Sequence, residues 1–135
     1  MLTRKEMEII RKMYEFLERG IEIVGPSMLA REFSMTRVSA YEFMKNLAKK
    51  KYLIHHKKKG FSLSEKGKKL GERIVRNHRV LEHFMFNMLK IDLEKACEYA
   101  KRLDIDIPEE LIESLYDALG RPKCCPHGKP IPRCI

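Results

Sequence analysis

The sequence has no run of about 18 apolar residues, the length that a membrane-spanning helix requires. Its first residues, MLTRKEMEII, lack the apolar core of a secretory signal peptide. Three catalytic motifs are also absent: G-x-S-x-G, the phosphate-binding G-x-x-x-x-G-K-[ST] and H-E-x-x-H. We therefore expect a cytoplasmic protein with no membrane partner, and an enzyme is the least favoured class of function.

Cysteine is scarce, and the four cysteines are unevenly placed. Cys97 stands alone, whereas Cys124, Cys125 and Cys134 fall with His127 in the proline-rich tail RPKCCPHGKPIPRCI. In a chain without a secretion signal, cysteines are more often reduced thiols or metal ligands than disulfides. The cysteines therefore indicate metal or redox chemistry, and the prolines predict an irregular tail.

Acidic residues are few in the first part of the chain. Residues 1–79 hold 20 Lys and Arg against 9 Asp and Glu, whereas residues 80–135 hold 8 against 10. Basic residues concentrated in one part of a chain favour binding of a polyanion such as nucleic acid. The second part is near neutral and is expected to have a different role.

The segment 25–66 predicts two short helices, a tight link and two strands around a basic tip. Pro26 suits the first turn of a helix, and Ser27 is expected to cap exposed amides there. Thr36 is expected to cap the second helix, over residues 37 to about 51, where apolar residues recur at helical spacing.

Gly60 ends the polar run HHKKKG between two apolar segments, which is typical of a β-hairpin. Two helices followed by a basic hairpin predict a winged helix, whose second helix enters the major groove of DNA. A basic run by itself is more often a solvated surface, so the order of the elements carries this interpretation. The candidate DNA-binding residues are Ser27, Thr36, Arg37, Ser39, Tyr41, Lys45, Lys57, Lys58 and Lys59.

Apolar residues at helical spacing predict four more helices, over residues 3–19, 64–90, 93–103 and 108–120. Thr3 and Glu6 fit a capping box, and Ser64 and Asp92 are expected to cap the helices that follow them.

The apolar faces of the last three helices, which include Leu103 and Leu111, exceed what this part of the chain can bury alone. A homodimer formed by helix packing would cover the excess, and a dimer suits a palindromic operator.

His78 and Glu82 are four residues apart on the predicted long helix, so they project from one face. The pair is suited to bind a divalent metal, and it is equally typical of an ion pair within a helix. The cysteines favour the metal alternative. Thiolate and imidazole ligands together favour Fe²⁺ or Zn²⁺ over Mg²⁺ or Ca²⁺.

Three stretches resemble the DtxR/MntR family of metal-dependent transcriptional regulators: YLIHHKKKGFSLSEKGKKLG, RNHRVLEHF and CPHGKPIP. The resemblance covers nearly the whole chain. It implies a mainly α fold, with a winged-helix DNA-binding domain at 1–72 and a helical metal-binding and dimerisation domain at 73–135. The chain is similar to short members of the family that lack the SH3-like third domain.

The resemblance also implies a set of metal ligands. In one family site, His78 and Glu82 match two of the ligand positions, and Cys97 takes a position that is histidine in some relatives. Cys125 or Cys124 is expected to add a ligand from the tail. In the other family site only two acidic ligands are retained, so we expect that site to be lost or weakened. Its positions are Glu8, Lys101, Asp104 and Ile105.

The sequence therefore predicts a transcriptional repressor that binds double-stranded operator DNA as a homodimer and responds to Fe²⁺ or Zn²⁺ rather than Mn²⁺. One alternative is a redox or iron–sulfur sensor that uses the cysteines. Another is an architectural DNA-binding protein that senses no metal.

Overall fold

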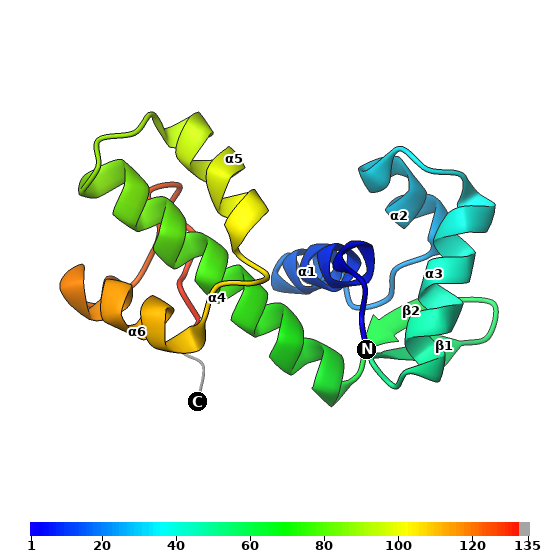
Figure 1. Cartoon of the computed structure of the whole chain (residues 1–135). Helices are drawn as coiled ribbons and strands as arrows, with labels where there is room; N and C mark the ends of the chain where they lie inside the picture. The colour runs from blue at the N-terminus through cyan, green and yellow to red at the C-terminus, as the bar shows by residue number, and fades with distance from the viewer. Residues whose placement is uncertain (133–135) are drawn as a thin grey trace. The chain divides into compact units, whose positions relative to one another are not determined.

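The computed structural model describes residues 1–132 (Figure 1). Within them the chain divides into two compact units, Met1–Gly71 and a second that begins at Glu72. The fold is mainly helical with one two-stranded antiparallel sheet, which confirms the predicted fold class. The elements in chain order are α1 (Arg4–Glu18), α2 (Pro26–Phe33), α3 (Arg37–Lys49), β1 (Leu53–His56), β2 (Gly60–Leu63), α4 (Glu65–Asn87), α5 (Leu93–Leu103) and α6 (Glu109–Ala118).

The predicted capping box opens α1. The Thr3 hydroxyl accepts a hydrogen bond from the backbone N–H of Glu6 at 3.1 Å, and the Glu6 carboxylate accepts one from the backbone N–H of Thr3 at 2.9 Å. Behind this start, Ile9, Ile10 and Met13 pack into the core of the first unit. Local spacing and apolar burial therefore agree on where α1 begins and which face it buries.

The same Glu6 carboxylate also holds α3, although it is only 1% exposed. It accepts hydrogen bonds from Asn46 Nδ2 at 2.9 Å and from Lys50 Nζ at 3.0 Å. Burial raises the pKa of Glu6, but its hydrogen bonds with Thr3 and Lys50 outweigh burial and hold the pKa below its ordinary value. One buried carboxylate thus links the start of α1 to the end of α3.

Replacing Glu6 by glutamine should lower the free energy of unfolding by about 1–2 kcal/mol, because hydrogen bonds to a charged group are lost. Urea denaturation followed by circular dichroism measures this. The matched control is Glu15→Gln, whose 3.7 Å ion pair with Lys12 is partly exposed and is worth at most about 1 kcal/mol. Equal destabilisation by the two variants would contradict the role given to Glu6.

The effect of Glu6→Gln should also depend on pH. Because the pKa of Glu6 is lower in the folded than in the unfolded chain, its carboxylate stabilises the fold at pH values above the unfolded-state pKa. That stabilisation is lost as the pH falls through the folded-state pKa. The difference between wild type and Glu6→Gln should therefore shrink on acidification.

The helix–turn–helix differs from prediction at its first cap. The N-cap of α2 is Gly25, Pro26 is the first helical residue, and Ser27 lies inside the helix, so the predicted serine cap was wrong. Thr36 caps α3 as predicted, since its hydroxyl accepts a hydrogen bond from Ser39 N–H at 3.0 Å. The helix ends at Lys49, two residues before the predicted end near 51.

The wing pairs β1 with β2 in the register Leu53↔Leu63 to His56↔Gly60. Val24 adds a third segment, because its N–H and C=O both pair with the backbone of Phe61 at 2.8 and 2.9 Å. Gly60 has φ +131°, and a Cβ there would lie 2.6 Å from the Val24 carbonyl oxygen. Glycine is therefore required both for the turn and for this close backbone approach.

In α4, Ser64 acts as the predicted cap and accepts a hydrogen bond from Gly67 N–H at 3.1 Å. The helix ends at Asn87 rather than near 90. Asp92 is the N-cap residue of α5, as predicted, but its side chain makes no capping hydrogen bond. No helix among residues 1–132 is both long enough and apolar enough to span a membrane.

The core of the second unit is formed by α4, α5, α6 and the tail, through Val80, Ala96, Ala100, Ile112 and Ile131. Leu103 was predicted to face inward and Leu111 to join the apolar stripe of α6, but they are 51% and 47% exposed in this chain.

The described part of the tail after α6, up to residue 132, contains no helix or strand, as its prolines predicted. It turns back on itself, with Cys125 N–H donating to the Lys129 carbonyl at 2.8 Å and Ile131 N–H to the Lys123 carbonyl at 2.9 Å.

Candidate metal centre and nucleic-acid interface

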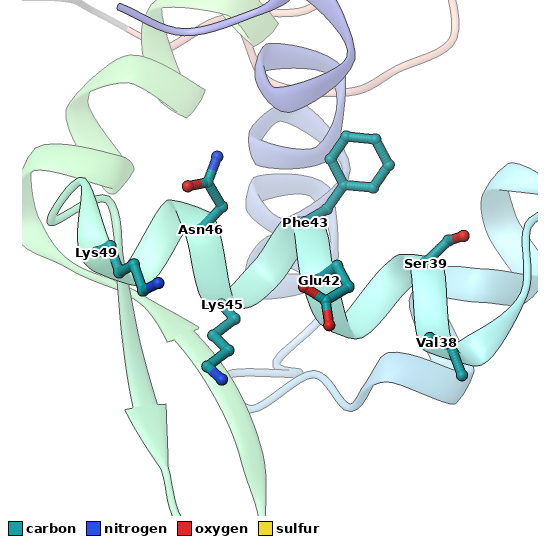
Figure 2. Close-up of a pocket in the computed structure, with 7 residues that line it drawn as sticks. All are labelled: Val38, Ser39, Glu42, Phe43, Lys45, Asn46 and Lys49. Carbon is teal, nitrogen blue, oxygen red and sulfur yellow. The ribbon is translucent and has the colours of Figure 1, made fainter.

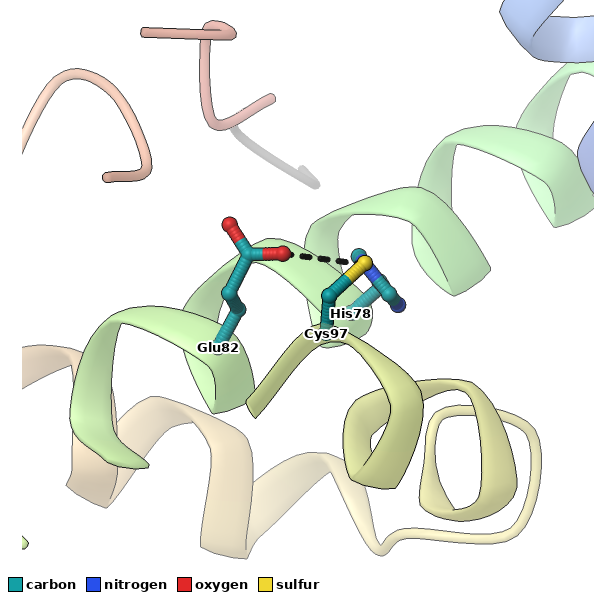
Figure 3. A group of neighbouring side chains, drawn as sticks. All are labelled: His78, Glu82 and Cys97. Carbon is teal, nitrogen blue, oxygen red and sulfur yellow. Dashed lines mark hydrogen bonds and ion pairs between the residues drawn. The ribbon is translucent and has the colours of Figure 1, made fainter. Parts of the chain in front are cut away.

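Three side chains from α4 and α5 meet in the second unit (Figure 3). His78 and Glu82 lie one helical turn apart on α4, with His78 Nε2 3.4 Å from Glu82 Oε2. Cys97, from α5, places Sγ 3.6 Å from the same Nε2. The ligand atoms of the three residues lie within 4.8 Å of one another. An imidazole, a carboxylate and a thiol at this separation form a candidate transition-metal site.

The turn in the tail brings a second group to the other oxygen of Glu82. His127 Nδ1 lies 2.8 Å from Glu82 Oε1, and Cys125 completes a group whose ligand atoms also lie within 4.8 Å of one another. Cys125 is 4% exposed, whereas His127 is exposed. Burial raises the pKa of the Cys125 thiol, and the Glu82 carboxylate raises it further. Glu82 is therefore common to both groups.

Asp104 supports the site from behind His78. It is fully buried, and its Oδ2 lies 3.3 Å from His78 Nδ1, so Nε2 is left to face Glu82 and Cys97. A carboxylate on the far nitrogen of a histidine fixes the orientation of the ring, as in carboxylate–histidine–metal arrangements. Asp104 therefore belongs to this site as an outer residue.

The site stabilises positive charge. Burial lowers the pKa of His78, but hydrogen bonds to Asp104, Cys97 and Glu82 outweigh it and raise the pKa to about 10. Burial raises the pKa of Glu82, but hydrogen bonds from His78 and His127 lower it to about 2. An ionised carboxylate that is only 1% exposed and lies between two imidazoles is a favourable position for a cation.

The structure brings together His78, Glu82, Cys97 and Cys125 of the predicted ligands. Cys124 is exposed and belongs to neither group. Glu8 lies in the first unit, where its carboxylate is 3.7 Å from Lys5 Nζ. The predicted set omitted His127, although its place two residues after Cys125, in a tail already rich in candidate ligands, was a signal for it.

The exposed face of α3 forms the candidate nucleic-acid interface (Figure 2). Ser39 and Lys45, both predicted, line a shallow groove of about 450 Å³. Val38, which is 72% exposed, and Glu42 line it too and were missed. The helical spacing of 38, 42, 45 and 49 could have identified this face.

A second groove, of about 590 Å³, lies between the start of α2, the start of α3 and the wing. It is lined by Ser27, Arg37, Lys58 and Lys59, among the predicted DNA contacts. Tyr41 also lines it, but this side chain is partly buried and packs edge-on against His55 and Phe61, with ring centroids 6.2 and 6.0 Å away. Of the other predicted contacts, Thr36 and Lys57 are exposed.

A basic winged helix followed by a helical unit with clustered metal ligands defines the class of metal-dependent DNA-binding regulators. The chain belongs to the iron-dependent repressor family: residues 64–133 match the family model described as "Iron dependent repressor, metal binding and dimerisation domain". The resemblance predicted from the sequence is thereby confirmed. The family consists of transcriptional regulators, not enzymes, and its members bind divalent metals.

Solved structures agree with this assignment. A hypothetical protein from Sulfolobus solfataricus is 32% identical, with a TM-score of 0.76 over 98% of this chain and 100% of that one. The manganese regulator SloR is 28% identical, with a TM-score of 0.82 over 96% of this chain and 60% of SloR. ScaR with bound Zn²⁺ is 30% identical, with a TM-score of 0.80 over 95% of this chain and 59% of ScaR. The chain thus spans about three fifths of the length of SloR and ScaR.

Proposed function

We propose that this chain is a repressor that binds a palindromic operator as a homodimer when a divalent metal occupies the cluster around Glu82. The observation that carries the proposal is the convergence of α4, α5 and the tail on one buried carboxylate. Family membership supports it. The ligands would come from His78 and Glu82 on α4, from Cys97 on α5 and from Cys125 and His127 in the tail. Metal binding around Glu82 would then fix segments that otherwise meet mainly through apolar packing.

The donor set favours Fe²⁺ or Zn²⁺. Each group combines a cysteine and a histidine with the shared carboxylate, whereas Mn²⁺ prefers oxygen ligands. Neither group in the described part of the chain holds more than one cysteine, so neither resembles the four-thiolate ligation of an iron–sulfur cluster. Cys134, which the redox alternative would also use, lies outside the described residues.

The proposed binding of operator DNA rests on the first unit. Exposed Arg37, Ser39 and Lys45 on α3 are suited to contact bases and phosphates, and the wing lysines are suited to contact the backbone. A homodimer would present two such surfaces to two half-sites. Its interface would cover the exposed apolar side chains of the second unit, which are Phe86, Met88, Leu89, Tyr99, Leu103 and Leu111.

The test is selection of DNA from a random duplex library by the Fe²⁺- or Zn²⁺-loaded protein under anaerobic conditions. Fluorescence anisotropy then measures affinity for the selected sequence with metal and with excess chelator. We expect binding at least about tenfold tighter with metal, equivalent to about 1.4 kcal/mol of coupling. Equal binding with and without chelator would favour the architectural alternative.

The adjacent cysteines provide a matched pair of variants for the ligand assignment. Cys125→Ser should weaken metal binding by at least about tenfold. Loss of a residue that only supports a ligand lowers the affinity of a metal site by about 10–100-fold, and loss of the ligand itself should cost no less. Cys124→Ser should leave the affinity unchanged, because that side chain is exposed and lies in neither ligand group. Competition with a chromophoric chelator measures both. A larger loss of metal affinity in Cys124→Ser than in Cys125→Ser would mean that Cys124, rather than Cys125, is the ligand.

A further inference from the structure

Two side chains on the exposed face of α3 do not have the chemistry of a phosphate contact. Val38 is apolar yet 72% exposed, and Glu42 is the only acidic residue among residues 33–64, against eight Lys and Arg. Both line the shallow groove on α3 (Figure 2). We propose that these two residues read bases of the operator: Val38 packs against the methyl group of a thymine, and Glu42 accepts a hydrogen bond from the N4 amino group of a cytosine. This inference rests on the proposed function, since it requires that α3 enters the major groove of DNA.

No neighbour on α3 pairs with the Glu42 carboxylate. On a helix, such a partner would lie three or four residues away. Lys45 instead places Nζ 5.8 Å from the centre of the Tyr41 ring, and Asn46 Nδ2 donates to Glu6 at 2.9 Å. In the described part of the chain, the Glu42 side chain is exposed and has no ion pair or hydrogen bond. The carboxylate is therefore available to a group outside the protein.

A carboxylate in a surface that meets DNA is repelled by phosphate, so a favourable contact must come from a base. Cytosine presents its N4 amino group, a hydrogen-bond donor, in the major groove, and glutamate is a residue type that accepts from it. Guanine and thymine present acceptors, which repel a carboxylate. Adenine has one donor, but its N7 acceptor lies beside that donor. Glu42 should therefore select cytosine.

Val38 is suited to the one apolar group that a base presents in the major groove, the methyl group of thymine. It is the second residue of α3, and the first residues of a recognition helix are those that contact base edges. Its chain neighbours Arg37 and Ser39 are polar and exposed. Val38 is therefore not part of a continuous apolar patch of the kind that binds another protein.

The spacing of the two residues predicts the spacing of the two bases. Val38 and Glu42 are four residues apart, which is about 6 Å along a helix that rises 1.5 Å per residue. Successive bases of a DNA strand are about 3.4 Å apart. With α3 lying along the major groove, we expect a T·A pair and a C·G pair about two base pairs apart in each half-site.

Selection from a random duplex library by the Fe²⁺- or Zn²⁺-loaded full chain, repeated with Glu42→Gln, tests the cytosine contact. Wild type should enrich thymine and cytosine at that spacing, and replacing the C·G pair should weaken its binding at least about fivefold. Glu42→Gln should prefer adenine instead, because glutamine pairs with N6 and N7 of adenine. Glu65→Gln, which changes a glutamate outside α3 whose side chain is 86% exposed, should retain cytosine.

Two outcomes would overturn the cytosine contact. One is a Glu42→Gln protein that still prefers cytosine. The other is a Glu42→Gln protein that binds all sequences more tightly by one factor and has no altered preference, since the carboxylate would then act only through its charge.

Replacing the selected thymine by deoxyuridine removes only the methyl group and tests the contact with Val38. Wild type should bind the deoxyuridine duplex about fourfold more weakly, as expected for one buried methyl group, whereas Val38→Ser should bind both duplexes equally. Ile54→Ser, which changes a 48% exposed side chain on β1, should retain the wild-type difference. Equal binding of the two duplexes by wild type would overturn the thymine contact.

Failure of this inference is distinguishable from failure of the proposed function. Metal-dependent binding to a selected duplex, with base preferences that neither variant alters, would contradict only the base contacts. Base preferences that follow Val38 and Glu42, in a protein that binds equally with metal and with chelator, would contradict only the metal-dependent function.

Discussion

Replacing Glu82 by glutamine should abolish the metal dependence of DNA binding, so that protein with metal and protein with chelator bind the same DNA equally. The reason is that, among residues 1–132, Glu82 alone is common to both ligand groups. A neutral amide in its place offers a much poorer ligand and removes the negative charge that attracts the cation. Fluorescence anisotropy with a metal-selected duplex, repeated over a range of metal concentrations, measures the effect.

Asp104→Asn tests a residue that supports a metal ligand without binding the metal itself. Asp104 contacts His78 Nδ1 at 3.3 Å and belongs to neither ligand group, so its loss should weaken metal binding by roughly 10–100-fold, as for other outer-shell partners. The titration curve should shift to higher metal concentration and still reach the wild-type plateau. Glu82→Gln should not reach that plateau at any accessible concentration.

His83→Gln serves as the control for both variants, since its ring contacts Asn87 rather than the cluster. A Glu82→Gln protein that is folded and still responds to metal would place the regulatory site elsewhere. A Glu82→Gln protein with the same shifted curve as Asp104→Asn would mean that Glu82 does not bind the metal directly.

The parts of the fold that depend on local spacing could be predicted from the sequence. The capping box of Thr3 and Glu6, the Thr36 cap and the Ser64 cap all join residues three positions apart, and each was correct. Ser27 has a suitable side chain but lies inside α2, and Asp92 is the N-cap residue of α5 without a capping hydrogen bond from its side chain. Cap chemistry thus shows where a helix can begin, and the surrounding chain decides which residue caps it.

Only the parts of the site that follow from helical spacing or from the family resemblance could be predicted from the sequence. His78 and Glu82 are linked by one turn of α4, whereas Asp104 was predicted for a different family site and instead lies behind His78. His127 reaches Glu82 because a short turn, closed by Cys125 N–H and the Lys129 carbonyl, reverses the tail. No periodicity in the sequence encodes that reversal.

Replacing Lys57, Lys58 and Lys59 with glutamine should weaken operator binding by up to several hundredfold for each protomer bound near 0.1 M salt. Each phosphate contact contributes about 0.9 to the slope of log K against log salt, so the three contacts of one wing contribute nearly 3 per protomer. All three lysines are exposed, and Lys58 and Lys59 line the groove between the wing and the start of α3. Anisotropy titrations at several salt concentrations measure the slope.

The same variant distinguishes affinity from sequence preference. Because lysine contacts with phosphate carry no sequence information, the wing variant should lose affinity for operator and for unrelated DNA by similar factors. A matched variant with Lys90, Lys95 and Arg102 changed to glutamine removes three exposed positive charges from the second unit and should leave the slope almost unchanged. If both variants lowered the slope equally, the effect would come from net charge; an unchanged slope in the wing variant would mean that the wing does not contact the DNA backbone.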